Sequence, residues 1–170
     1  MLKALKEQLK LLAEDKNKVF HKSLKERVGK RATQQIESEI KNFILLMPDW
    51  IEQIHSHWNR QSVGSIKKIS GYLLTYLYHP HDFLSDTEYG LLGYLDDAYY
   101  VACIYEIVLK NLYSAGEPLK PFEEELMEKL PQLKSIVHKI LPQETQQIDA
   151  MIEELLSPNE TKEQFESLFK

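Results

Sequence analysis

Tyr78-His79-Pro80-His81-Asp82-Phe83-Leu84-Ser85-Asp86, followed by Gly90-Leu91-Leu92-Gly93-Tyr94-Leu95-Asp96-Asp97, is the stretch from which the fold is predicted. It places four aspartates, two histidines and two glycines between segments that have the composition of a hydrophobic core. Ser85 and Glu88 have the spacing of a capping box, in which the hydroxyl and the carboxylate satisfy amides of a first helical turn. We therefore expect a helix to begin near Asp86 and to continue to about Asn111.

The expected helix has one inward face, on which Asp97 lies, whereas Asp96 lies near the edge of that face. A carboxylate removed from water needs partners, so we expect a network that joins the loop to the helix. Gly90 and Gly93 each weaken a helix by up to about 1 kcal/mol relative to alanine, which indicates close approach of another backbone. The inward face consists of Gly90, Gly93, Tyr94, Asp97, Val101, Ile104, Tyr105 and Val108.

Two interpretations of the acidic stretch remain open. The favoured one is a structural aspartate network without a cofactor, because aspartates at a helix start are commonly caps. The alternative is a divalent metal site, because carboxylates and imidazoles suit Mg²⁺, Mn²⁺ or Fe, which activate water for phosphoester hydrolysis. The network candidates are Pro80, Asp82, Asp86, Gly90, Gly93, Asp96 and Asp97. The metal-ligand candidates are His79, His81, Asp82, Asp86, Asp96 and Asp97.

The residues of this stretch resemble the YkvA-like family of domains of unknown function. The resemblance is carried by Leu77-Tyr78-His79-Pro80-His81-Asp82, by Asp86 and by Gly93-Tyr94-Leu95-Asp96-Asp97, within about residues 66–108. The chain departs from the family pattern at Ser85, where the family usually has proline, and in a gap from Asp86 to Gly93 that is one residue longer. The resemblance implies a compact helical domain and brings no established reaction with it.

Other catalytic patterns are not found. Cys103 lies in an apolar run, where we expect a buried and protonated thiol, and the chain has no Gly-x-Ser-x-Gly elbow. The two glycines at 90 and 93 are too few for a phosphate loop. Few histidines lie on the predicted helices, which argues against a di-iron bundle.

Composition predicts one cytoplasmic domain. The chain has 170 residues, 43% of them hydrophobic, which is enough for one core. A single cysteine, Cys103, is typical of a reducing compartment. The segment after Met1 lacks the apolar run of a secretory signal, and the apolar stretch 98–109 is shorter than the roughly 20 residues that span a bilayer. We therefore expect no transmembrane segment.

Charge is unevenly distributed along the chain. Residues 1–70 carry 14 Lys and Arg against 8 Asp and Glu, whereas residues 71–170 carry 7 against 18. This polarity favours packing of the two halves on each other or on opposite partners, and it argues against nucleic acid as a ligand. Leu2, Leu5, Leu9 and Leu12 predict a basic helix, which we expect to dock on the acidic half or on a second subunit. A membrane-surface helix and a solvated arm are the alternatives.

Regularly spaced apolar residues predict a long core helix over residues 33–58, which Pro48 kinks or restarts. His55 and His57 point to different sides of it, which disfavours a shared metal, and Trp50 and Trp58 are interpreted as core or rim aromatics. A further helix is expected over residues 66–77. Gly29 and Ser114-Ala115-Gly116 are expected helix ends.

The C-terminal third is expected to form acidic helices of about ten to fifteen residues, separated by prolines. Its last helix is expected to begin at Ser157 and Pro158, with an apolar edge that should dock on other residues. The prolines are Pro118, Pro121, Pro131, Pro142 and Pro158, and the apolar edge consists of Phe165, Leu168 and Phe169.

Together these patterns predict an all-α fold, a single-domain irregular bundle of about six to eight helices. We expect a basic helical segment over residues 1–31, a YkvA-like core over 32–116 and an acidic extension over 117–170 that packs on the core. The predicted function is a non-enzymatic protein-interaction or adaptor domain with a protein partner or self-association. A metal-dependent hydrolase is the alternative, and a peripheral membrane protein attached through the basic N-terminus is the weaker one.

Overall fold

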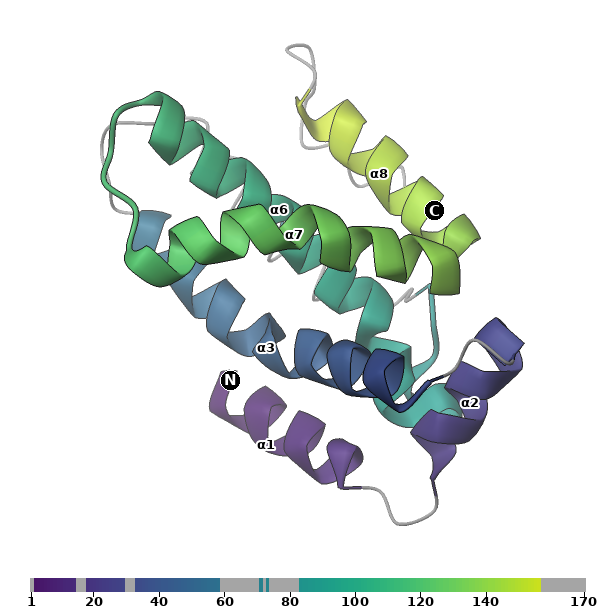
Figure 1. The fold of residues 1–170 in the computed structure, drawn as a ribbon. Coiled ribbons are helices and arrows are strands. Elements are labelled where there is room, and N and C mark those ends of the chain that lie inside the picture. The colour runs from purple at the N-terminus through teal and green to yellow at the C-terminus, as the bar shows by residue number, and fades with distance from the viewer. Residues whose placement is uncertain are drawn as a thin grey trace.

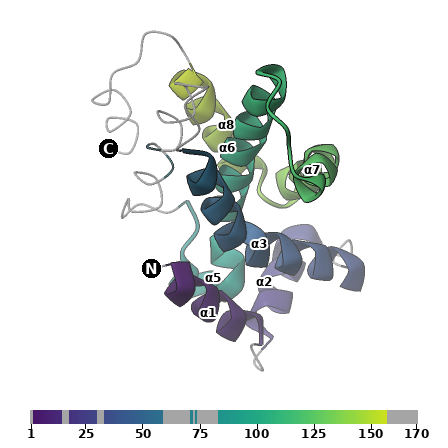
Figure 2. The same cartoon turned by 90° about the vertical axis from the view of Figure 1, so that its left-hand side faces the viewer.

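Helix α6 (Leu95–Ser114) forms the centre of the computed structural model, which describes residues 2–14, 18–29, 33–58, 71, 73 and 83–156. Fourteen of its 20 residues are buried, which is more than one face of a helix can supply, so α6 is surrounded by other elements. It packs against α3 (Gln34–Trp58), α7 (Pro121–Ile140) and α8 (Pro142–Leu156), as Figure 2 shows.

The basic N-terminal segment lies on the body of the bundle (Figure 1). It forms two helices, α1 (Leu2–Ala13), which packs along α3, and α2 (Val19–Val28), which contacts α7 and two short helices of the central stretch, α5 (Asp86–Tyr89) and η2 (Gly90–Tyr94). Leu9 is fully buried, and Lys6 forms an ion pair with Asp49 of α3. Arg27 Nη1 lies 2.9 Å from Glu144 Oε1 of α8. The basic helix α1 therefore docks chiefly on α3, within residues 1–70, and not chiefly on the acidic half as expected, whereas α2 reaches that half through Arg27.

The central stretch folds as two short helices, α5 (Asp86–Tyr89) and the 3₁₀ helix η2 (Gly90–Tyr94), followed by the long helix α6, so the prediction of one helix over 86–111 is wrong. The start at Asp86 is confirmed, but the Ser85 side chain makes no capping hydrogen bond to this helix. Gly90 has a φ of 58°, in the left-handed region, and an α-helix cannot continue through such a residue.

Two prolines lie inside helices. Pro48 is within α3, which does not restart there, and Pro131 is within α7. The prediction that Pro131 separates two helices is therefore wrong. The cost of proline in a helix, about 3 kcal/mol, is offset by burial on both sides of it, at Leu130 and Val137 of α7. Pro121 and Pro142 do begin helices, where the missing amide hydrogen costs nothing.

The predicted helix ends are confirmed at two glycines. Gly29 follows α2, and Gly116 follows α6 with a φ of 73°. The Glu117 amide donates to the Leu112 carbonyl at 3.0 Å and the Gly116 amide to the Tyr113 carbonyl at 3.0 Å, which is the Schellman arrangement. The chain thereby turns from α6 towards α7.

The fold is an all-α helical bundle, as predicted, and the described residues include no strand. One hydrophobic core contains side chains from α1 at one end of the chain to α8 at the other. Among the described helices, none is both long enough and apolar enough to cross a bilayer. Of the expected helix over 66–77 only Gly71 and Leu73 are described; both are helical, and Leu73 is buried. The side chain of Trp58 and the expected elements after Leu156 lie outside the described residues.

Candidate functional site

The buried carboxylate of the central stretch is Asp96. It is fully buried, and its Oδ2 accepts a hydrogen bond from the Leu84 amide at 3.2 Å, which ties the loop before α5 to α6. Asp97 is only partly buried, so the expected positions of the two aspartates are exchanged. The reason is the 3₁₀ step at η2, which changes the rotation of α6 relative to a continuous helix counted from Asp86.

Asp86 joins three elements. Its Oδ2 accepts from the Tyr94 hydroxyl at 2.9 Å, and that hydroxyl accepts from Gln8 Nε2 of α1 at 2.7 Å. Gly93 permits this geometry, because a Cβ at this position would lie 2.5 Å from the Asp86 Cα. The expected close backbone approach is confirmed at Gly93, whereas Gly90 has the neighbouring side chain of Val19 at 3.7 Å and is explained by its positive φ.

The metal interpretation finds no complete site in the part of the chain that is described. His79, Pro80, His81 and Asp82 lie outside it. Within it, no group of three or more His, Cys, Asp or Glu residues is arranged to hold a metal ion. Three of the candidate carboxylates, Asp86, Asp96 and Asp97, are described, and Asp86 and Asp96 bind different partners within the fold.

A fully buried cluster lies where α3, α6 and α7 meet, and we refer to His57, Tyr105 and Glu123 as the Glu123 cluster. Glu123 Oε1 lies 2.7 Å from His57 Nε2 and accepts from the Tyr105 hydroxyl at 2.9 Å. Glu123 Oε2 accepts from the Lys120 amide at 2.9 Å, so the same carboxylate closes the N-terminus of α7. All three side chains are enclosed by the bundle.

Burial by itself would raise the pKa of Glu123, but hydrogen bonds from the Lys120 amide, His57 and Tyr105 outweigh it and hold that pKa below its usual value. Burial and the adjacent carboxylate raise the pKa of Tyr105, so the phenol keeps its proton. A carboxylate that orients a histidine is the arrangement of a general base. Because His57 and Glu123 are fully buried, a substrate cannot reach His57, and the cluster joins helices instead.

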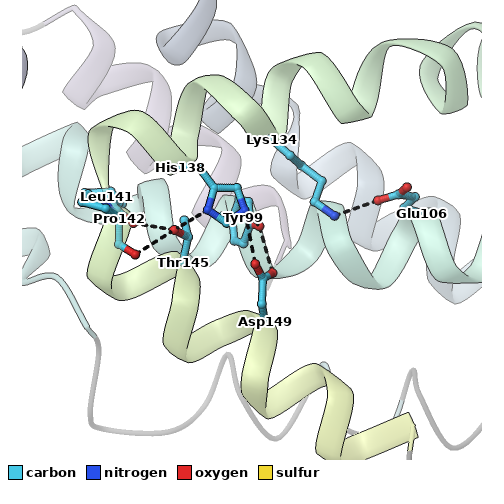
Figure 3. A network of polar contacts seen from close by, with 8 residues as sticks. All are labelled: Tyr99, Glu106, Lys134, His138, Leu141, Pro142, Thr145 and Asp149. Atoms are coloured by element: carbon cyan, nitrogen blue, oxygen red, sulfur yellow. Dashed lines mark hydrogen bonds and ion pairs between the residues drawn. The ribbon is translucent and has the colours of Figure 1, made fainter.

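A second cluster, partly open to solvent, joins α6, α7 and α8 (Figure 3). We refer to Tyr99, His138, Thr145 and Asp149 as the His138 cluster. The Tyr99 hydroxyl donates to Asp149 Oδ1 at 2.9 Å and lies 2.7 Å from His138 Nε2. His138 Nδ1 lies 2.9 Å from Thr145 Oγ1, and His138 Nε2 lies 3.2 Å from Asp149 Oδ2.

Thr145, His138 and Asp149 have the connectivity of a nucleophile, base and acid. The chemistry does not follow, because Thr145 is fully buried and its hydroxyl donates to the Leu141 carbonyl at 2.6 Å. Burial, with Cys103 and Asp149 nearby, raises the pKa of Tyr99, so this phenol also stays protonated. The His138 cluster therefore fastens the α7–α8 hairpin to α6.

Cys103 lies between this cluster and an ion pair of α6 with α7. Lys134 Nζ donates to Glu106 Oε2 at 2.8 Å (Figure 3), and Lys110 Nζ lies 2.6 Å from Glu106 Oε1. Burial raises the pKa of the Cys103 thiol to about 11, although the nearby Lys134 opposes this. The expectation of a buried, protonated thiol is confirmed.

Sequence reasoning did not identify the residues of these two clusters. It separated His57 from His55, and the separation is confirmed, since His57 is fully buried and His55 is exposed. The hydrogen bonds of the two clusters join residues up to 66 positions apart in the sequence, and no local sequence pattern indicates such pairings. One usable signal was present, because Lys120-Pro121 with Glu123 has the spacing of a helix start whose third residue closes the cap.

A groove of about 700 Å³ lies between the end of α1, the start of α2 and the first half of α3. Apolar side chains and polar or charged ones share its lining. The apolar residues are Leu12, Ala13, Phe20 and Leu45, and the polar or charged ones are Lys18, His21, Gln34, Glu37, Ser38, Lys41 and Asn42. Unlike the enclosed Glu123 cluster, this surface faces solvent, and it is the candidate binding site.

No family model, curated protein or solved structure matches the chain.

Proposed function

We propose that the chain is a non-enzymatic protein-interaction domain of the adaptor kind, and that its partner binds in the groove between α1, α2 and α3. The observation that carries this proposal is the groove itself. Its volume of about 700 Å³ lies in the range of ligand sites, and its lining combines apolar side chains with polar and charged ones. Protein interfaces likewise combine apolar and polar side chains.

The two clusters support an interaction role by what their polar groups are used for. In the Glu123 cluster the carboxylate accepts from two side chains and one amide, and in the His138 cluster each ring nitrogen has a neighbour in the protein. Groups bound in this way stabilise the packing of helices. The cytoplasm is the proposed location, because one buried cysteine suits a reducing compartment.

Membership of the YkvA-like family is part of the same proposal. Its support is the resemblance at Gly93-Tyr94-Leu95-Asp96-Asp97, together with the use of these residues in the fold. Gly93 lets η2 pass the Asp86 backbone, and Asp96 binds the Leu84 amide. A structural role for the motif is consistent with a family to which no reaction is attached.

Site-specific photo-crosslinking in cells that express the protein natively tests the interaction. A photoreactive residue replaces the exposed Ser38 in the groove, and a matched one replaces the exposed Glu128 on α7. We expect a discrete protein adduct from position 38 and none of the same size from position 128. Adducts that are equal at both positions, or absent from position 38, would contradict a binding role for the groove.

The metal-dependent hydrolase is tested on the same purified chain. Metal content and hydrolysis of an aryl phosphate are measured for the wild type and for Asp97→Asn. We expect no stoichiometric metal and no turnover. Metal that is bound one to one by the wild type and lost from a folded Asp97→Asn variant would replace the interaction proposal with the hydrolase.

A further inference from the structure

We propose that the occupant of the groove is an acidic amphipathic helix of a partner protein, and that Lys18 selects for its charge. This inference rests on the proposed function and adds the class of partner. Its observations are the shape of the groove, the charges along it and the backbone conformation of Lys18.

The walls of the groove suit a helix. Lys6 of α1 pairs with Asp49 of α3, whereas Leu12 of α1 and Leu45 of α3 line the groove, so the two helices run antiparallel side by side (Figure 1). Phe20 of α2 is buried and lines the same groove. A groove with apolar side chains along two helices receives the apolar face of a third, through residues spaced i, i+3, i+4 and i+7.

The charges of the lining favour an acidic ligand. Glu37 is the one carboxylate among the described residues that line the groove. The hydrogen bond from His21, supported by Lys41, lowers the pKa of Glu37, so its negative charge is present and compensated at neutral pH. His21 Nδ1 lies 2.7 Å and Lys41 Nζ 3.2 Å from its oxygens.

Lys18 supplies the remaining positive charge. It lines the groove, is exposed, and has no ion-pair partner in the described part of the chain. Its φ of 56° and ψ of 29° place it in the left-handed region, and it is the one non-glycine with a positive φ among the described residues. This conformation costs a lysine about 1 kcal/mol or more, whereas glycine adopts it freely.

The backbone at position 18 would accept glycine with less strain, so the chain keeps a charged side chain where it is conformationally unfavourable. Strain of this kind concentrates at functional positions. It also provides a clean variant. Lys18→Gly removes the charge and the strain together, so a loss of binding by this variant is not explained by a weaker fold.

The experiment uses a fluorescein-labelled helical peptide of about 18 residues, with leucine on one face and glutamate on the others, titrated with the full chain by fluorescence anisotropy. We expect saturable binding that weakens as salt is raised. Lys18→Glu should weaken binding about tenfold, and Lys18→Gly about threefold without lowering the Tm. Lys22→Glu is the matched control, an exposed lysine on α2 outside the groove, and should stay within about twofold.

Each other occupant has its own outcome, and each overturns the inference. A peptide with lysine in place of glutamate that binds equally well would show that charge does not select. Vesicles of phosphatidylglycerol that bind the chain, with the Lys18→Glu effect, while the acidic peptide does not would assign the groove to a membrane. A dimer in sedimentation that Lys18→Glu dissociates would assign it to a second copy.

The crosslink at Ser38 separates this inference from the function on which it rests. If the peptide fails to bind and the Ser38 adduct persists, the partner class is wrong and the interaction role stands. If both fail, both proposals are overturned.

Discussion

The two polar clusters of this bundle use the same chemistry at different depths. Each combines a tyrosine of α6, a residue of α7 and one or two residues of a third helix, and each contains one histidine and one carboxylate. In the Glu123 cluster His57 and Glu123 have no exposed surface, whereas in the His138 cluster the side chains of His138 and Asp149 are 42% and 38% exposed.

The difference teaches that burial, more than the residues themselves, decides what such a cluster contributes. Water can replace a lost partner at the open cluster, but it cannot do so around Glu123. We therefore expect substitutions in the Glu123 cluster to cost more stability than substitutions in the His138 cluster or at exposed neighbours.

Glu123→Ala should have the largest effect. It leaves His57 and Tyr105 buried without their shared acceptor and opens the N-terminus of α7, so we expect the free energy of unfolding to fall by about 3–5 kcal/mol. Urea unfolding followed by circular dichroism measures it. The exposed neighbour Glu124→Ala is the control and should change it by less than about 0.5 kcal/mol. Equal effects of the two would contradict the importance of depth.

Removing the two hydroxyls compares the clusters directly. Tyr105→Phe deletes a buried hydrogen bond to a carboxylate and should cost about 1.5–3 kcal/mol. Tyr99→Phe leaves His138 and Asp149 in contact with each other and with water, so about 0.5–1.5 kcal/mol is expected. The same denaturation measurement applies, and a larger loss for Tyr99→Phe would reverse the order proposed here.

Acid should act through the Glu123 cluster. The folded-state pKa of Glu123 lies below its ordinary value of 4.5, so its contribution to stability is complete above pH 4.5 and is lost as the pH falls further. Thermal unfolding between pH 6 and pH 3 should therefore show a steeper decline for the wild type than for Glu123→Gln, which has no carboxylate to protonate. Parallel curves would count against an ionised Glu123 in the core.

Asp149→Ala should have the smallest effect on global stability, about 0.5–1 kcal/mol, because the pair that it removes is partly exposed. Its consequence is local, since α8 then lacks one of its bonds to Tyr99. We expect Cys103 to react faster with a disulfide reagent in this variant than in the wild type, while the unfolding midpoint hardly moves. An unchanged labelling rate would show that Asp149 does not restrain α8.

The helical class was predictable because period and end signals are local. The spacing of Ile40, Ile44, Met47 and Ile51 along α3 comes directly from the sequence, and so does the end of α6 at Gly116. The prediction that Pro131 separates two helices failed because a proline signal reports only local preference. Whether a helix such as α7 tolerates a proline depends on packing that only the folded chain supplies.

The site residues were harder to predict from the sequence, for two physical reasons. A residue count from Asp86 assumes an α-helical rotation, but the left-handed φ at Gly90 and the 3₁₀ turn of η2 change that rotation, so Asp96 is buried more deeply than Asp97. The clusters depend on which helices become neighbours, so Glu123 finds His57 only after α3 and α7 have both packed on α6. The charge of Lys18 was visible in the sequence, but its backbone conformation was not.

The enclosure of α6 determines how substitutions in the surrounding helices affect the stability of the fold. Because α3, α7 and α8 each pack against a different side of α6, displacement of any one of them exposes part of α6 to solvent. Substitutions in any of these three helices should therefore weaken packing on the same helix, α6. A single stabilising substitution within α6 should compensate for several of them.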